Sequence, residues 1–301
     1  MPTAGRTPSA RAQWRGRFLI ALAALLWGTG GAWAKCPPLA ALEPAQRGLL
    51  LGCWRAGFAA LFLAGLLRHP MPKFRPVVVL MVAAFATMNV CVMLAMSFTT
   101  AAASIVLQYT SVFWVTALAR ILGERADRRD WVCTAAALSG VVVLLGGEWG
   151  RGTEQGALLA LASGLTYAVV VLCLRTLRDT DAAWLVWSNH FGAWVLLVAF
   201  AWRPSATLDA VQWSVLAGMG ACQMGLPYWL FARGLHVVPA TEAALWCLLE
   251  PVSTPLWTWV FWGERIPRAT LVGGAIVLAA LIARLRRRAP QVAESATAAA
   301  R

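Results

Sequence analysis

The sequence predicts an all-α, polytopic membrane protein in which ten transmembrane helices form two inverted five-helix repeats. Three observations lead to this fold class. Sixty per cent of the 301 residues are hydrophobic and 13 per cent are charged, against about 25 per cent charged residues in a soluble globular protein. The apolar residues gather in about ten stretches near the length that crosses a bilayer. One residue pattern also recurs 140 positions along the chain.

The apolar stretches define the expected spans. They cover residues 18–35, 48–67, 77–97, 101–122, 131–147, 156–174, 183–202, 212–232, 239–262 and 269–285. The connections between them are short. The chain therefore has no room for a separate soluble domain.

The repeat is clearest in two phrases that each end one apolar stretch, Leu122-Gly123-Glu124-Arg125 and Trp262-Gly263-Glu264-Arg265. The same offset pairs Ala103 with Ala243, Val112 with Val252, Arg128 with Arg268, Val132 with Val272, Ala135 with Ala275, Leu138 with Leu278, Trp27 with Tyr167 and Lys35 with Arg175. A fixed offset indicates two copies of one unit. We assign residues 18–147 and 154–285 to the two copies, between terminal tails 1–17 and 286–301.

Ten spans in two copies give five spans per copy. Because five is odd, the second copy enters the membrane from the opposite side. Inverted repeats are typical of transporters, which place a shared site near the bilayer midplane.

The basic residues are distributed unevenly between the two ends of the spans. With a cytoplasmic N-terminus, 19 of the 26 Lys and Arg residues fall on the cytoplasmic side, six fall on the opposite side, and Arg55 lies inside a span. This asymmetry follows the positive-inside rule. It predicts an inner-membrane protein with both termini cytoplasmic, in contact with lipid, and it argues against a nucleic-acid partner despite the net charge of +13.

The N-terminal segment also resembles a signal peptide, because basic residues and a short apolar run precede Ala32-Trp33-Ala34. Cleavage there would leave nine spans and an unmatched repeat. We therefore interpret the segment as the first span.

Two charged residues lie within apolar spans, where a charge costs about 3 kcal/mol or more. They are Arg55 in the second span and Glu250 in the ninth. One interpretation is a structural ion pair that joins the halves. The other is a site for a charged substrate or a coupling proton. We favour a structural role for Arg55 and leave both roles open for Glu250.

Pro251 follows Glu250 and removes a backbone hydrogen bond to the carbonyl of Cys247, one turn earlier. Helical spacing then predicts that Trp246, Glu250, Ser253 and Trp257 share one face. Aromatic rings around an acid suit an organic amine through cation–π contact. The alternative is that this face packs against another helix.

Polar side chains near the centres of four further spans are candidates to line a hydrated cavity. They are Asn89, Gln108, Asn189, His190 and Gln223. Each could instead hold helices together. Glu124 and Glu264 lie at span ends, where we expect them to orient the adjoining helices. No metal-ligand spacing, P-loop or nucleophile constellation occurs, so we expect no enzyme activity, metal or cofactor.

The chain resembles the EamA-type transporters of the drug/metabolite transporter superfamily. The resemblance rests on Leu26-Trp27-Gly28 through Lys35, on Ala101 through Glu124 with Gly140, and on Glu250-Pro251 through Glu264 with Gly273-Gly274. Such proteins have ten helices in inverted repeats, and many export amino acids or other small metabolites. The fourth span carries Ser111 where the family commonly has proline, which predicts an undistorted helix there.

The sequence thus predicts a secondary transporter, an exporter of an amino acid or amine-like metabolite, that works by alternating access with proton coupling through Glu250. A homodimer is left open. The alternative from another class is a non-transporting membrane scaffold or subunit.

Overall fold

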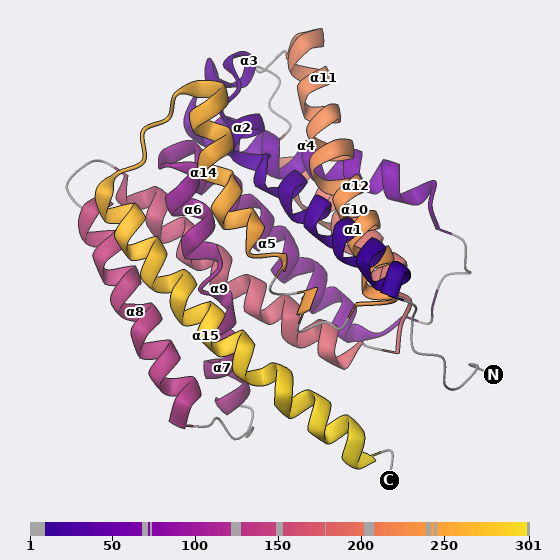
Figure 1. Ribbon diagram of the computed structural model, residues 1–301. Helices are drawn as coiled ribbons and strands as arrows, with labels where there is room; N and C mark the ends of the chain where they lie inside the picture. Colours follow the sequence, from indigo (N-terminus) through magenta and orange to yellow (C-terminus); the bar gives the residue numbers. More distant parts are fainter. Residues whose placement is uncertain are drawn as a thin grey trace.

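The chain folds into a bundle of long α-helices (Figure 1). The computed structural model describes residues 10–67, 72, 74–121, 128–148, 153–177, 179–201, 208–238, 242, 243 and 246–299. Within these ranges every regular element is a helix and no strand occurs. The all-α prediction is therefore confirmed.

The first half supplies five spans. They are α1 (Ala10–Gly28) with α2 (Gly30–Ala34), α4 (Pro44–Ala64), α5 (Pro76–Phe98), α6 (Ala101–Gln108) with α7 (Ser111–Ile121), and α8 (Arg128–Glu148), and the short α3 (Pro37–Ala40) follows the first of them. Local chemistry sets the helix starts. Pro44 stands in the first turn of α4, where the Glu43 carboxylate accepts two backbone N–H groups, and the Thr100 hydroxyl caps α6.

The second half supplies the other five. They are α9 (Glu154–Thr176), α10 (Ala182–Ala201), α11 (Ala210–Gly218) continued through the π-helix η1 (Met219–Gly225) into α12 (Leu226–Leu235), α14 (Leu249–Trp262) and α15 (Arg268–Ala299). Among the described residues, seven spans are long and apolar enough to cross a membrane, and Trp131–Gly147 and Arg268–Ala283 are shorter apolar helices. With the 14-residue α14, these account for the ten expected spans.

The packing of α8 against α15 shows that the halves are inverted (Figure 1). These helices are counterparts at the 140-residue offset. Gly140 approaches Gly273 so closely that a Cβ on either glycine would lie within 2.7 Å of the other's carbonyl oxygen, and Gly147 meets Ala269. Because later residues of α8 meet earlier residues of α15, the two counterparts run antiparallel.

A second contact lies between counterparts. Trp54 of α4 and Trp194 of α10 are 140 positions apart, and their ring centroids lie 6.4 Å apart. Two equivalent residues in contact place the pseudo-twofold axis between them. The pairing of α4 with α10 therefore lies at the centre of the duplicated structure.

The contacts between span ends agree with the predicted alternation of sides. Lys35 contacts Thr99 and Glu264, and Gln212 donates to the Pro38 carbonyl; all of these belong to one predicted side. The pairs Arg17–Glu242 and Arg75–Asp179 join ends that belong to the other side. Each contact joins span ends that lie on the same side of the membrane when successive spans alternate in direction.

The fourth span is broken, so the prediction of an undistorted helix around Ser111 is wrong. α6 ends at Gln108, a turn follows, and α7 begins at Ser111. The Leu107 carbonyl accepts both the backbone N–H of Thr110 at 3.2 Å and its hydroxyl at 2.6 Å. Local bonding by a threonine side chain thus ends the helix without a proline.

The other half is also less regular than expected. The ninth span, predicted over 239–262 with a distortion at Pro251, is divided one turn before that proline: Trp246 is still helical, Cys247 and Leu248 form a turn, and α14 begins at Leu249. The eighth span contains η1, a π-helical segment, inside the predicted 212–232. Such segments frequently mark functional sites.

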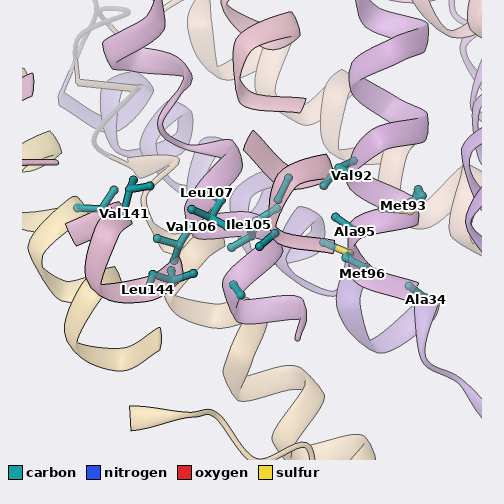
Figure 2. Packing of buried hydrophobic residues seen from close by; sticks show 14 of the residues in the cluster. Ala34, Val92, Met93, Ala95, Met96, Ile105, Val106, Leu107, Val141 and Leu144 are labelled. Carbon is teal, nitrogen blue, oxygen red and sulfur yellow. The ribbon is translucent and has the colours of Figure 1, made fainter. Parts of the chain in front are cut away.

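The largest apolar cluster holds α6 in place. Its members include Ala34 of α2, Val92 and Met96 of α5, Leu107 of α6 and Leu144 of α8, and Figure 2 shows them on both sides of α6. All eight residues of α6 are buried. The break after Gln108 therefore lies in the interior, and the direction of the next side chain, Tyr109, is fixed by packing.

Candidate functional site

Arg55 is the hub of a buried polar cluster that ties four helices together. Its side chain is only 4% exposed. One guanidinium nitrogen donates to Gln223 Oε1 at 3.3 Å and another donates to Asn89 Oδ1. Gln223 in turn donates to the Trp27 carbonyl at 3.0 Å, and Asn89 donates to the Gly52 carbonyl. Arg55 Nε has no partner among the described residues.

The π-helix positions this cluster. It widens the eighth span around Gln223 and presents Gly220 to α4, where a Cβ would lie 2.9 Å from the Arg55 carbonyl oxygen. A larger residue at position 220 would push η1 away from α4. The backbone contact therefore sets the distance between Arg55 and Gln223.

Glu250 is held by a different set of groups. The Tyr109 hydroxyl lies 2.8 Å from Glu250 Oε2 and 2.8 Å from the Cys247 carbonyl oxygen. Tyr109 belongs to the turn between α6 and α7, and Glu250 stands at the start of α14, directly before Pro251. The breaks in the fourth and ninth spans thus meet at this contact.

Arg55 and Glu250 do not form the ion pair that the sequence suggested as one interpretation. Among the described residues, the Arg55 side chain bonds to Asn89 and Gln223, whereas the Glu250 side chain bonds to Tyr109. The two groups still lie close enough to interact electrostatically, and Tyr228 lies close enough to both to do so. The site therefore offers a basic and an acidic group that are held separately.

All three tyrosines of the chain lie around Glu250. Tyr109 bonds to it, and Tyr167 of α9 and Tyr228 of α12 interact with it electrostatically. Glu250, Tyr109 and Tyr228 are half-buried, and Tyr167 is 37% exposed. This role was not predicted from the sequence. The available signal was that so rare a residue occurs three times, each time within a span.

Aromatic rings extend the site on one flank. Trp27 meets Tyr228 edge-on at 5.0 Å and Phe231 at 5.4 Å. His190 lies between Tyr228 and Phe85, with both centroids 4.9 Å away. Its Nδ1 lies 2.8 Å from the Val186 carbonyl oxygen, which requires the proton on Nδ1, and Nε2 has no partner in the described part of the chain.

The five polar residues expected to line a cavity are all buried. Asn89, Gln108, Asn189, His190 and Gln223 are at most 9% exposed. Interhelical bonds hold Asn89 and Gln223, and a backbone carbonyl of its own helix holds His190. All five side chains are therefore shielded from solvent in this conformation.

The two tryptophans predicted near Glu250 contact different partners. Trp246 precedes the start of α14, with its Nε1 3.5 Å from Glu242. Trp257 stacks on Phe261 at 5.9 Å, and its buried Nε1 has no partner among the described residues. Ser253 meets Gly28 of α1. Glu250, Ser253 and Trp257 lie together on α14, whereas Trp246 stands before the turn at Cys247 and Leu248.

Ion pairs tie the first and ninth spans together at both ends of the site. Glu264 accepts from Lys35 Nζ at 2.8 Å and from the Ala101 backbone N–H at 3.2 Å. At the other end Arg17 lies 2.6 Å from Glu242. Glu124, the counterpart of Glu264, lies outside the described residues. Pro251 is buried.

A family model described as the EamA-like transporter family matches residues 14–146 and again 154–285. An "Uncharacterized transporter" of Archaeoglobus fulgidus is 24% identical over 61% of this chain and 67% of its own length. "Uncharacterized transporter YwfM" of Bacillus subtilis is 28% identical over 54% and 56% of the two chains. A "Riboflavin transporter" of Rhizobium johnstonii is 28% identical over 59% of each.

The matches to these relatives therefore span between 56% and 67% of their lengths. A solved structure described as "Crystal structure of protein" superimposes with a TM-score of 0.58 at 19% identity. It covers 91% of this chain and 96% of its own. That likeness concerns the fold.

Proposed function

Because the chain belongs to the EamA-like transporter family, we propose that it exports a small organic metabolite with a positively charged group, bound at Glu250. That the chain is a multi-pass membrane transporter follows from the family and from its apolar helices. The substrate, the direction and the mechanism are our proposal. So are the inner-membrane location, the cytoplasmic termini and the boundaries of the two halves, 18–147 and 154–285.

The observation that carries the proposal is the surrounding of Glu250. A half-buried carboxyl at the junction of both halves is flanked by three tyrosines and, through Tyr228, by Trp27. A carboxylate attracts an ammonium group, and aromatic faces stabilise a cation by about 0.5–2 kcal/mol. Substrate would therefore bind with its amine toward Glu250.

Arg55 supports a substrate that also carries a negative group. Its guanidinium is fixed by Asn89 and Gln223, and its Nε has no partner among the described residues. An amino acid bears both charges, and its carboxylate would be oriented toward Arg55. A flat aromatic side chain would suit the rings of Trp27 and Phe231. A relative named as a riboflavin transporter makes riboflavin a useful probe of that flank.

Transport by alternating access follows from the inverted halves in this proposal. The Lys35–Glu264 and Arg17–Glu242 pairs close the two ends, and each would separate in turn while the other holds. A proton exchanged at Glu250 would couple the cycle to the membrane gradient. One chain holds both halves, so the cycle requires no homodimer.

The test is counterflow in proteoliposomes that contain the purified full-length chain. Radiolabelled amines and amino acids, deaminated analogues of the same carbon skeleton, and riboflavin are compared. We expect amine-containing solutes to exchange and the deaminated analogues to fail. Glu250→Gln removes the charge at constant size and should abolish the exchange. If no solute moves in any lipid composition, the chain is a scaffold instead. If deaminated analogues move equally well, the role of Glu250 in substrate binding is wrong.

A further inference from the structure

The Tyr109 hydroxyl faces two acceptors but has one hydrogen. Its oxygen lies 2.8 Å from the Cys247 carbonyl oxygen and 2.8 Å from Glu250 Oε2. A carbonyl only accepts, and an ionised carboxylate only accepts. A phenol cannot donate fully to both. Both contacts are satisfied together only if one of the acceptors carries a proton of its own.

The Cys247 carbonyl depends on Tyr109 because of the sequence that follows it. Pro251 has no N–H, so the ordinary bond one helical turn later is absent. The carbonyl accepts the Glu250 backbone N–H at 3.0 Å in a tight turn, and Tyr109 supplies its second bond. This bond crosses from one half of the protein to the other, at the point where α14 begins.

We propose that Glu250 carries a proton in this conformation and that Tyr109 is a positioning residue that couples loss of this proton to the α14 start. With Glu250 protonated, its O–H donates to Tyr109 Oη, and Tyr109 donates to the Cys247 carbonyl. When the proton leaves to water, the carboxylate takes the Tyr109 hydrogen, because charge-assisted bonds are the stronger ones. The Cys247 carbonyl then loses its bond to the other half.

The inference rests on the proposed function in one respect, since the proton that leaves would be the coupling ion. It deepens that proposal by naming the atom that holds the proton and the bond that responds. Lower pH favours the conformation described here. Higher pH releases the segment before Leu249 from Tyr109.

The groups that face Glu250 leave this assignment intact. Tyr167 of α9, Tyr228 of α12 and Cys247 lie close enough to interact electrostatically, and Arg55 of α4 attracts the carboxylate. Arg55 is already bonded to Asn89 and Gln223. From α1 and α2, Arg17 and Lys35 are paired with Glu242 and Glu264. Among the described residues, the Glu250 side chain is hydrogen-bonded only to Tyr109.

Infrared difference spectroscopy of the full-length protein in liposomes tests the protonation directly. On raising the pH, we expect the wild type to lose a carbonyl band of a protonated carboxyl, and Glu250→Gln to lack that band. Tyr109→Phe should keep the band but change its frequency, since the acid loses its hydrogen-bond partner. Tyr167→Phe is the matched control: it removes a nearby hydroxyl that does not bond to Glu250, so the frequency should stay unchanged.

Alkylation of Cys247, kept as the only cysteine, reports the released segment. Dividing each rate by that of Glu250→Gln at the same pH cancels the intrinsic pH dependence of the thiol. The wild-type ratio should rise from one at low pH to about fivefold at high pH, the equivalent of one lost hydrogen bond. The alkylation ratio of Tyr109→Phe should be above one at both low and high pH.

The inference is overturned if the wild type lacks the protonated-carboxyl band at every pH. It is also overturned if Glu250→Gln shows the same band as the wild type. A Tyr109→Phe variant that matches the wild type in both band frequency and alkylation ratio likewise overturns it. Neither readout requires transport. Transport without these signatures would therefore reject the inference alone, and the signatures without transport would reject the proposed function alone.

Discussion

Lys35 and Glu264, which belong to different halves and stand 229 positions apart, form an ion pair of 2.8 Å at one end of the bundle. Their side chains are 23% and 13% exposed. Glu264 also accepts the Ala101 backbone N–H. One carboxylate thus connects the end of α2, the start of α6 and the end of α14.

Glu264→Gln should open that end of the protein. The amide keeps an acceptor for Ala101 but loses the charge that attracts Lys35, at a cost of about 1.5–3 kcal/mol for a bond between charged groups. A cysteine at Thr258, which is 1% exposed, should then react at least about tenfold faster with a membrane-impermeant thiol reagent. Asp179→Asn, in an exposed pair at the other predicted side, is the control. Equal rates in both variants would show that the pair does not hold the end closed.

Asn89→Leu should destabilise the protein strongly. It removes the oxygen that accepts from Arg55 and leaves a buried charge underpaired, which typically costs about 3–5 kcal/mol. Arg55→Met in the same background removes the charge and should recover part of the loss. The check is a double-mutant cycle on unfolding in mixed micelles. Additive effects would mean that the two residues act independently.

Gly140→Leu should separate α8 from α15. A Cβ at position 140 would lie 2.7 Å from the Gly273 carbonyl oxygen, and overpacking of this kind costs about 1–3 kcal/mol. Gly146→Leu is the control, because it makes the same substitution further along α8. A Cβ at position 146 would have no neighbouring atom within 4 Å, so the stability of this variant should be unchanged. Thermal unfolding followed by fluorescence decides between them. Equal melting temperatures would argue against a tight helix contact.

The apparent affinity for an amine substrate should weaken as the pH falls. The ammonium group and a proton compete for the same carboxylate, so the dissociation constant rises by up to about tenfold per pH unit while Glu250 is being protonated. Competition binding on the purified protein measures this slope. In Glu250→Asp the slope should persist, whereas in Glu250→Gln it should be flat. A slope that survives in Glu250→Gln would place the titrating group elsewhere.

Much of the fold could be predicted because its signals are one-dimensional. A span shows as a run of apolar residues, and a duplication shows as a fixed offset, such as that of Val132 and Val272. Local breaks were harder. Ser111 suggested an unbroken fourth span, yet Thr110 ends α6 through its own hydroxyl, a competition between side chain and backbone that span length does not record.

The site was predicted in part for a similar reason. Arg55 and Glu250 stand out because charges are costly in a bilayer. Tyr109 does not stand out, because its importance comes from one contact with a residue 141 positions away. His190 and Asn189 were placed on the correct span, but their burial depends on which way α10 is rotated against α5 and α12.

The sequence by itself determined that this protein lies in a membrane, that it is duplicated and that its halves are inverted, because hydrophobicity, periodicity and parity are properties of the chain alone. Only the tertiary structure decided that Arg55 bonds to Asn89 and Gln223 while Glu250 bonds to Tyr109. These pairings join residues on separate helices. Helix breaks, a π-helical segment and close glycine contacts set the rotation and spacing of those helices, and a one-dimensional pattern does not contain them.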